Sequence, residues 1–187
     1  MKKVLVLIMV VLSILACQDY ANACIGRILT IGILNAPQEQ LLAEMVALLL
    51  NERTGTNVKM VSFKDSKELY SAVKKGEVGL VIENIERGMT MIGISGENDS
   101  KLCYDLMKKG YRKNLNLVWL EQFGVGRHYA PVISVDILET MPALPKLVGK
   151  LTGIINDETA LKLIKSAGPE GKMHKVARDF LKAKRLI

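Results

Sequence analysis

Apolar and polar residues alternate in blocks along the first part of the chain, and these blocks predict strands and helices in turn. The apolar run over residues 27–34 has the composition of a buried strand. Asn35 or Ala36 then caps a helix that carries Pro37 in its first turn, where the missing N–H costs nothing. Residues 40–50 are apolar on nearly every side of this helix, which indicates that it is deeply buried.

The same succession continues further along the chain. Residues 57–63 alternate between polar and apolar, as a strand does, and Asp65 or Ser66 caps the helix that follows. Residues 78–82 predict a third short strand. Strand, helix, strand, helix and strand at this spacing predict parallel pairing with right-handed crossovers. The predicted fold class is therefore α/β, with a mostly parallel sheet flanked by helices.

The second half of the chain predicts a different succession of elements. Residues 88–99 are rich in Gly, Ser and Asn and predict a loop, whereas residues 99–113 predict a helix. Residues 115–120 predict a fourth strand. Beyond the hinge-like stretch 124–126 we expect a helical C-terminal part, with breaks at its prolines and glycines.

Polar residues follow two of the predicted strands. Asn35 comes directly after the first strand and precedes Ala36 and Pro37, and Glu83 and Asn84 come directly after the third strand. Ligands on parallel α/β sheets bind outside the carboxyl ends of the strands. These two strand exits are therefore the expected places of a binding site.

The N-terminus has the pattern of an export signal. Residues 1–3 form a short basic region, and an almost unbroken apolar run over residues 4–16 follows it. This run is too short to span a bilayer comfortably. We therefore expect export, to the periplasm or to the outer face of the membrane.

Two processing patterns are present, and the sequence leaves both open. Residues 21–23 have the small-x-small pattern that the general signal peptidase cuts, which makes 1–23 the signal peptide and Cys24 the new N-terminus. The residues before Cys17 resemble a bacterial lipobox, in which Cys17 receives a lipid and residues 1–16 are removed. The second pattern implies an anchored protein.

The part that follows the signal, residues 24–187, is long enough to bury the core of a single α/β domain. Removing two of the 26 Lys and Arg and one of the 19 Asp and Glu leaves 24 against 18, a net charge of +6. The charges are interspersed along the sequence rather than clustered. We expect them to serve solubility, and we expect no nucleic-acid partner.

Motifs typical of catalysis are incomplete. Residues 93–97 come close to a nucleophile elbow, but the fifth position is Glu instead of Gly. Residues 124–126 have two of the glycines of a dinucleotide fingerprint without the third. His128 and His174 lack Cys or carboxylate neighbours at the spacing of metal ligands. We therefore expect no enzyme, no cofactor and no metal site.

Two blocks of the sequence, residues 29–83 and 104–187, carry short motifs in a characteristic order. The motifs are Thr30-Ile31-Gly32 with Asn35, residues 40–45, residues 72–78, residues 116–124, residues 130–133, residues 147–152 and residues 176–181. In order and spacing they resemble the substrate-binding proteins of ABC transporters for quaternary ammonium osmoprotectants such as glycine betaine, choline and carnitine. The resemblance covers most of the chain after the signal.

The sequence departs from this family at the hinge and at the ligand contacts. Family members have two α/β lobes that close on the ligand, whereas residues 124–130 stand here in place of a whole second lobe, so a single periplasmic-binding-protein-like lobe is expected. Ala36 stands where the family favours an aromatic residue, and only Glu83 remains of the family pattern at the third strand. Tyr129 is the aromatic residue left to hold a quaternary ammonium over its ring.

The resemblance implies a substrate-binding component of an ABC transporter for a small quaternary-ammonium or similar osmolyte, with an ABC permease of the inner membrane as its partner. The predicted ligand-binding residues are Asn35, Ala36, Pro37, Glu83, Asn84 and Tyr129. One lobe leaves the ligand uncovered, so we expect a second copy, in a homodimer, or another protein to cover that face. The alternative is a single-lobe accessory or interaction protein of the cell envelope that binds no ligand.

Overall fold

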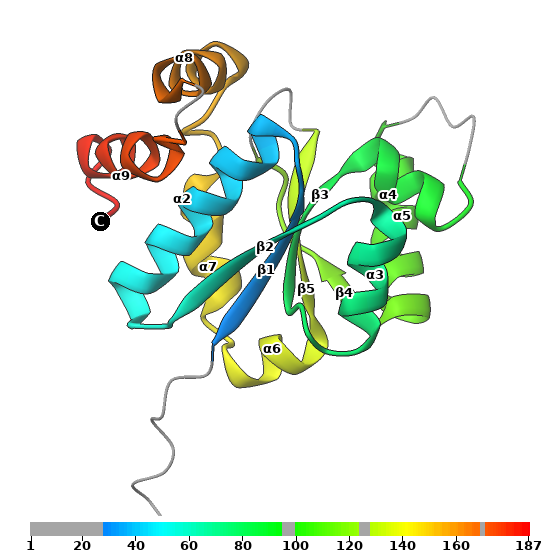
Figure 1. The fold of residues 1–187 in the computed structure, drawn as a ribbon. Coiled ribbons are helices and arrows are strands. Elements are labelled where there is room, and N and C mark those ends of the chain that lie inside the picture. Colours follow the sequence, from blue (N-terminus) through cyan, green and yellow to red (C-terminus); the bar gives the residue numbers. More distant parts are fainter. Residues whose placement is uncertain (1–27, 95–99, 124–127, 169–170) are drawn as a thin grey trace, which may run out of the picture.

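The computed structural model describes residues 28–94, 100–123, 128–168 and 171–187 (Figure 1). The strands are β1 (Leu29–Leu34), β2 (Val58–Phe63), β3 (Leu80–Asn84), β4 (Leu117–Trp119) and β5 (Tyr129–Ser134). The helices are α2 (Pro37–Thr54), α3 (Ser66–Lys74), α4 (Ile85–Met91), α5 (Ser100–Leu115), α6 (Val135–Thr140), α7 (Leu144–Val148), the 3-10 helix η3 (Gly149–Leu151), α8 (Asp157–Ala167) and α9 (Met173–Ala183). The N-terminal segments that the sequence assigns to export lie outside the described residues.

The strands form one sheet in the order β2-β1-β3-β5-β4. Strand β1 pairs in parallel with both β2 and β3, and β5 pairs antiparallel with both β3 and β4. The predicted α/β class is confirmed, and the sheet is mixed, with two parallel and two antiparallel pairings among the described strands. The expectation that the chain is helical from the hinge to its end was wrong over β5, which lies between β3 and β4.

Strand β5 shows why the sequence pattern misled. Tyr129, Val132 and Ile133 are residues that favour strands, but Pro131 next to them lacks the N–H that a central strand normally donates. In the sheet Pro131 lies opposite Ile82 of β3, and its carbonyl accepts a hydrogen bond from the Leu120 N–H at 2.9 Å. Pro131 therefore pairs through its carbonyl oxygen alone, and β5 keeps its register with both neighbouring strands.

Helices cover both faces of the sheet (Figure 1). Helices α2, α7, α8 and α9 lie on one face, and α3, α4 and α5 lie on the other. Two clusters of buried side chains correspond to these two layers. Helix α2 is buried along most of its length, as its apolar sequence predicted, because α9, α8 and α7 cover the side that faces away from the sheet. Within the described ranges, no helix is long and apolar enough to cross a membrane.

Helix α4 corrects the expected loop after residue 88. The side chain of Asn84 caps this helix, because its Oδ1 accepts hydrogen bonds from the N–H groups of Glu86 at 2.9 Å and Arg87 at 3.3 Å. Gly88 lies inside the helix against Trp119: a Cβ at this position would come within 2.6 Å of the indole Cζ2. A glycine that looks like a helix breaker in the sequence is here required by close packing.

Replacing Gly88 with alanine is therefore expected to lower the free energy of unfolding by about 1–3 kcal/mol, since the added methyl group forces α4 away from the buried indole. Urea unfolding followed by Trp119 fluorescence measures this. Gly149→Ala is the matched control, because the nearest atom to a Cβ there is 4.0 Å away and the φ of −57° suits any residue. Equal stabilities of the two variants would contradict the packing argument.

Candidate functional site

The predicted ligand-binding residues meet where the parallel strands end, and we call this end of the sheet the carboxyl edge. Asn35 follows β1, Glu83 and Asn84 end the parallel neighbour β3, and Tyr129 begins β5, which runs the other way. The strand register places Asn84 directly opposite Tyr129. Ala36 lies at the same edge, where it precedes α2. The structure therefore brings these residues together, and their role in binding stays a prediction.

A group of charged side chains lies directly beneath this edge. Arg87 bonds to two carboxylates: its Nη1 lies 2.7 Å from Glu39 Oε1, and its Nε donates to Glu83 Oε1. Its Nη2 donates to the carbonyl of Ile82 at 3.1 Å. Glu39 also accepts the backbone N–H of Leu34 at 2.7 Å, which ties α2 to the end of β1. Glu39 and Glu83 are only 2% and 0% exposed.

The second oxygen of Glu83 extends this group into the core. Tyr70 of α3 donates its hydroxyl hydrogen to Glu83 Oε2, and the hydroxyls of Tyr70 and Tyr111 lie 2.7 Å apart. The N–H of Asn84 donates to Glu83 Oε1 at 2.8 Å. We call Glu39, Arg87, Glu83, Tyr70 and Tyr111 the buried polar chain. Because both oxygens of Glu83 are bonded inside the protein, this side chain supports the edge rather than facing an incoming ligand.

Burial is the largest single influence on the pKa values of Glu83, Arg87 and Tyr70. It raises the pKa of Glu83, while the charge of Arg87 and the hydrogen bond from Tyr70 act in the opposite direction. Burial would lower the pKa of Arg87, but the charge of Glu83 and the contacts with Glu39 outweigh burial and raise the pKa above its usual value. Burial and the charge of Glu83 raise the pKa of Tyr70, so its hydroxyl stays a donor. The guanidinium is therefore the fixed cation on which the carboxylates depend.

Tyr129 lies in a mostly acidic environment. Its pKa is raised first by burial and next by the charge of Glu39, and Glu86 adds a smaller effect of the same sign. A hydrogen bond with the Asn84 side chain and the charge of Arg87 act in the opposite direction. Two carboxylates against one guanidinium near this ring favour a cationic ligand over an anionic one.

The amide side chains at the edge already have partners in the protein. Asn35 Oδ1 accepts a hydrogen bond from Gln40 Nε2 at 2.9 Å, and Asn84 Oδ1 caps α4. Pro37 opens α2 and is exposed. Cys17, the predicted lipid attachment residue, lies outside the described residues. Of the predicted set, the ring of Tyr129 is thus the group best suited to contact an apolar cation.

The sequence predicted Glu83 but missed its partners. Arg87 follows Glu83 by four residues, a spacing that signals an ion pair only when both residues share a helix, and here Glu83 ends a strand. Glu39 carried a weaker signal as an acidic residue in the first turn of an otherwise apolar helix. Tyr70 and Tyr111 are brought to Glu83 by tertiary packing, for which the sequence has no local signal.

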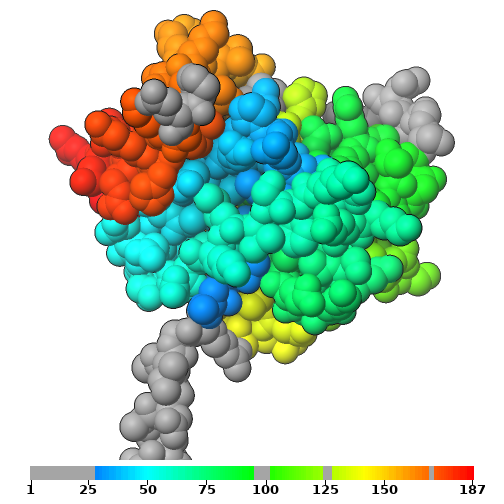
Figure 2. All heavy atoms as spheres, viewed as in Figure 1, coloured from blue at the N-terminus to red at the C-terminus, as the bar shows by residue number. Residues whose placement is uncertain are grey.

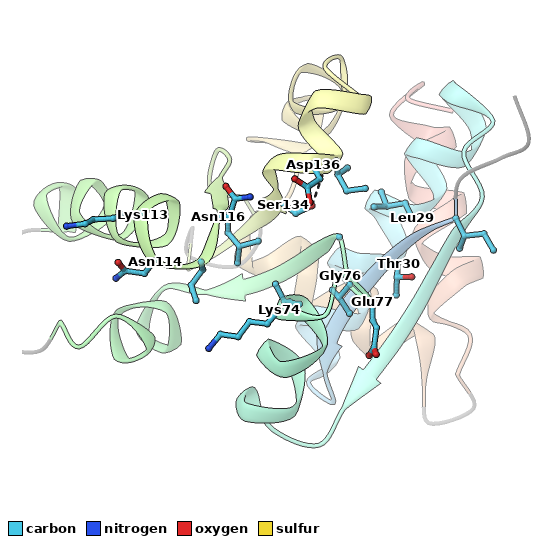
Figure 3. Close-up of a pocket in the computed structure, with 17 residues that line it drawn as sticks. Leu29, Thr30, Lys74, Gly76, Glu77, Lys113, Asn114, Asn116, Ser134 and Asp136 are labelled. Carbon is cyan, nitrogen blue, oxygen red and sulfur yellow. Dashed lines mark hydrogen bonds between the residues drawn. The ribbon is translucent and has the colours of Figure 1, made fainter. Parts of the chain in front are cut away.

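A separate cavity of about 590 Å³ lies at the opposite edge of the sheet (Figure 3). Thr30 near the start of β1, Glu77 before β3, Asn116 before β4 and Asp136 after β5 line it. None of the predicted ligand-binding residues lines it. The hollow shown in Figure 3 and the predicted site are therefore distinct places on the molecule.

The class of the protein follows from a family match over more than half of the chain. The sequence profile of the family described as "Substrate binding domain of ABC-type glycine betaine transport system" matches residues 28–147. The chain belongs to this family. No curated protein sequence matches the chain.

Solved structures show the same fold at low sequence identity. A glycine betaine/carnitine/choline ABC transporter structure superposes with a TM-score of 0.77 at 14% identity, covering 84% of this chain and 99% of the other. Apo YehZ from Escherichia coli gives a TM-score of 0.71 at 14% identity, covering 85% and 99%. Lactococcal OpuAC in its closed form with glycine betaine gives 0.51 at 6% identity, covering 86% and 97%. These similarities support the fold.

Proposed function

We propose that this chain is the exported substrate-binding component of an osmoprotectant ABC transporter, and that it binds a small quaternary-ammonium osmolyte at the edge formed by Asn35, Asn84 and Tyr129. The observation that carries the proposal is the place of Tyr129, whose half-buried ring lies opposite Asn84 at the ends of the parallel strands, where Glu39 and Glu86 add negative charge. A quaternary ammonium has no N–H to donate, so an aromatic face and nearby negative charge are the groups that recognise it.

Thermal unfolding with glycine betaine, choline or carnitine tests this proposal. A ligand that binds the native state at 100 times its Kd adds about 2.7 kcal/mol to the free energy of unfolding, which for a chain of this length raises Tm by about 5–10 °C. Tyr129→Ala should reduce this stabilisation to about 0.9–2.2 kcal/mol at the same ligand concentration, since a desolvated ring contributes about 0.5–2 kcal/mol to binding a cation.

Tyr129→Phe is the matched control for the ring. It keeps the aromatic face and removes the hydroxyl, so the shift with ligand should be retained. If none of the three compounds raises Tm at millimolar concentration, quaternary-ammonium binding is rejected. An equal shift for wild type and Tyr129→Ala would instead place binding elsewhere on the chain.

The second candidate function is a ligand-free accessory protein of the cell envelope. The scarcity of aromatic rings at the edge favours it. Ala36 follows β1 and Asn84 ends β3, so neither of these positions carries a ring, and Phe123, next to Tyr129 in the sheet, is only 2% exposed. A second copy that covers the edge with its own Tyr129 would supply another ring. Light scattering with and without ligand separates these cases, because a monomer under both conditions excludes a homodimeric receptor.

A further inference from the structure

Helix α5 exposes a strongly basic surface. Its sequence contains five Lys or Arg residues and one acidic residue. Lys108, Lys109, Arg112 and Lys113 are all exposed, and we call these four residues the basic face. These four charges lie within six consecutive residues, 108–113, so this part of the sequence is a local basic cluster that the overall charge pattern did not reveal.

The opposite side of α5 fixes the direction of this surface. Cys103, Met107 and Tyr111, which follow one another at intervals of four residues, are buried against the rest of the domain. Side chains at this spacing share one side of a helix. The basic face therefore points away from the sheet, on the layer opposite to α2 and α9 (Figure 1).

Apolar side chains lie in line with the basic face. Leu102 and Leu106 are 44% and 36% exposed, and the spacing of Leu102, Leu106, Lys109 and Lys113 places them on one stripe of the helix. Lysines beside exposed leucines on one helix surface are typical of helices that lie in the interface of a membrane.

The C-terminal end of α5 lies at the sheet edge where the described chain begins. Ile28 and Lys113 line the same cavity, and Figure 3 shows Lys74 and Lys113 extending from α3 and α5 to the same side. Glu77 and Asp136 also line this cavity and balance the two lysines there, whereas Lys108, Lys109 and Arg112 of the basic face do not line it.

A lipid on Cys17 would hold this edge close to a bilayer, because the stretch from Cys17 to Ile28 spans at most about 40 Å even when extended. A single lipid chain gives only marginal, reversible membrane binding, and a basic patch is one of the second signals that make an anchor stable. Because α5 ends close to Ile28, where the described chain begins, a lipid on Cys17 and the basic face would meet the same bilayer.

We infer that the basic face of α5, with Leu102 and Leu106, binds an anionic lipid surface. Charge complementarity supplies the attraction, and the exposed leucines supply the apolar contact that distinguishes a bilayer from other anionic partners. The inference is independent of osmolyte binding, because the candidate ligand site lies at the carboxyl edge of the sheet.

Vesicle co-sedimentation tests it on the chain from residue 24, which retains every element of the described fold and lacks Cys17. Vesicles of phosphatidylcholine with about one third phosphatidylglycerol should bind the protein, and pure phosphatidylcholine vesicles should not. Each Lys or Arg near an anionic surface contributes about five-fold to the affinity. The variant with Lys108, Lys109, Arg112 and Lys113 all changed to Gln should therefore bind at least about 100-fold more weakly.

The matched control changes the same amount of charge on the other layer, at Lys146, Lys165, Lys175 and Lys182, which are also exposed. This variant should bind the anionic vesicles nearly as wild type does. Equal losses in the two variants, or equal binding to neutral vesicles, would overturn the inference. Tighter binding to double-stranded DNA than to the vesicles would also overturn it. Circular dichroism melts check that both variants fold. Their Tm should stay close to that of wild type, because exposed substitutions usually change stability by less than about 0.5 kcal/mol.

Discussion

Replacing Arg87 with alanine is expected to lower the free energy of unfolding by about 3–5 kcal/mol, because it leaves two buried carboxylates without their shared cation. Glu39 and Glu83 are almost fully buried, and Arg87 bonds to both. Neither carboxylate can reach water without displacing its backbone partner, the N–H of Leu34 or of Asn84. Urea unfolding monitored by circular dichroism gives the free energy directly.

The loss of stability in Arg87→Ala should depend on pH, and the pKa of Glu83 gives its direction. Burial already raises the pKa of Glu83 above its ordinary value of 4.5, and Arg87 opposes this rise, so removing Arg87 raises the pKa further. A carboxyl group with a raised pKa in the folded state favours folding most when it is protonated, below its unfolded pKa, and loses this contribution as pH rises through the folded pKa. The defect of Arg87→Ala should therefore be smaller near pH 5 than near pH 8.

Arg178→Ala is the matched control, because Arg178 pairs with Glu52 at the same distance of 2.7 Å but at the surface. Exposed ion pairs contribute about 0–1 kcal/mol, so this variant should remain close to wild type at both pH values. A similar small loss in Arg87→Ala would show that the buried carboxylates find other partners, and the account of the buried polar chain would then fail.

The sequence predicted the parallel part of the fold because each of its elements carries its own local signal. Strand β1 is a continuous apolar run, α2 is apolar on nearly all sides, and Asp65 caps α3 as expected. Elements whose signals depend on distant residues were missed. Helix α4 contains Gly88, whose suitability depends on the indole of Trp119, and β5 contains Pro131, whose position depends on the pairing of its neighbours.

The sequence also predicted only part of the candidate site. Strand exits identified Asn35, Glu83 and Asn84, because a parallel sheet always gathers the ends of its strands at one edge. The same rule says nothing about what lies beneath that edge. Arg87 meets Glu39 across 48 positions of sequence, and Tyr70 meets Tyr111 across 41. Contacts of this kind are set by the packing of helices on both sides of the sheet.

Leu49→Ala is expected to lower the free energy of unfolding by about 2–5 kcal/mol. Leu49 is 0% exposed in α2, which packs against the sheet on one side and against α7, α8 and α9 on the other. Polar contacts such as Arg178 with Glu52 also join α9 to α2, which limits how far the layers can collapse into a cavity. Leu161→Ala in α8 is the control: at 48% exposure it should cost less than about 0.5 kcal/mol.

Comparing Leu49→Ala with Arg87→Ala separates the packing of the domain from the support of its site. Both variants should melt at lower temperature than wild type. Leu49 belongs to the hydrophobic core and takes no part in the buried polar chain, so Leu49→Ala should keep most of the increase in Tm that ligand gives the wild type. Arg87 bonds to Glu83 and helps to fix the strand end that carries Asn84, so Arg87→Ala should lose most of this increase as well. Loss of the ligand response in both variants would mean that the edge has no support separate from the core.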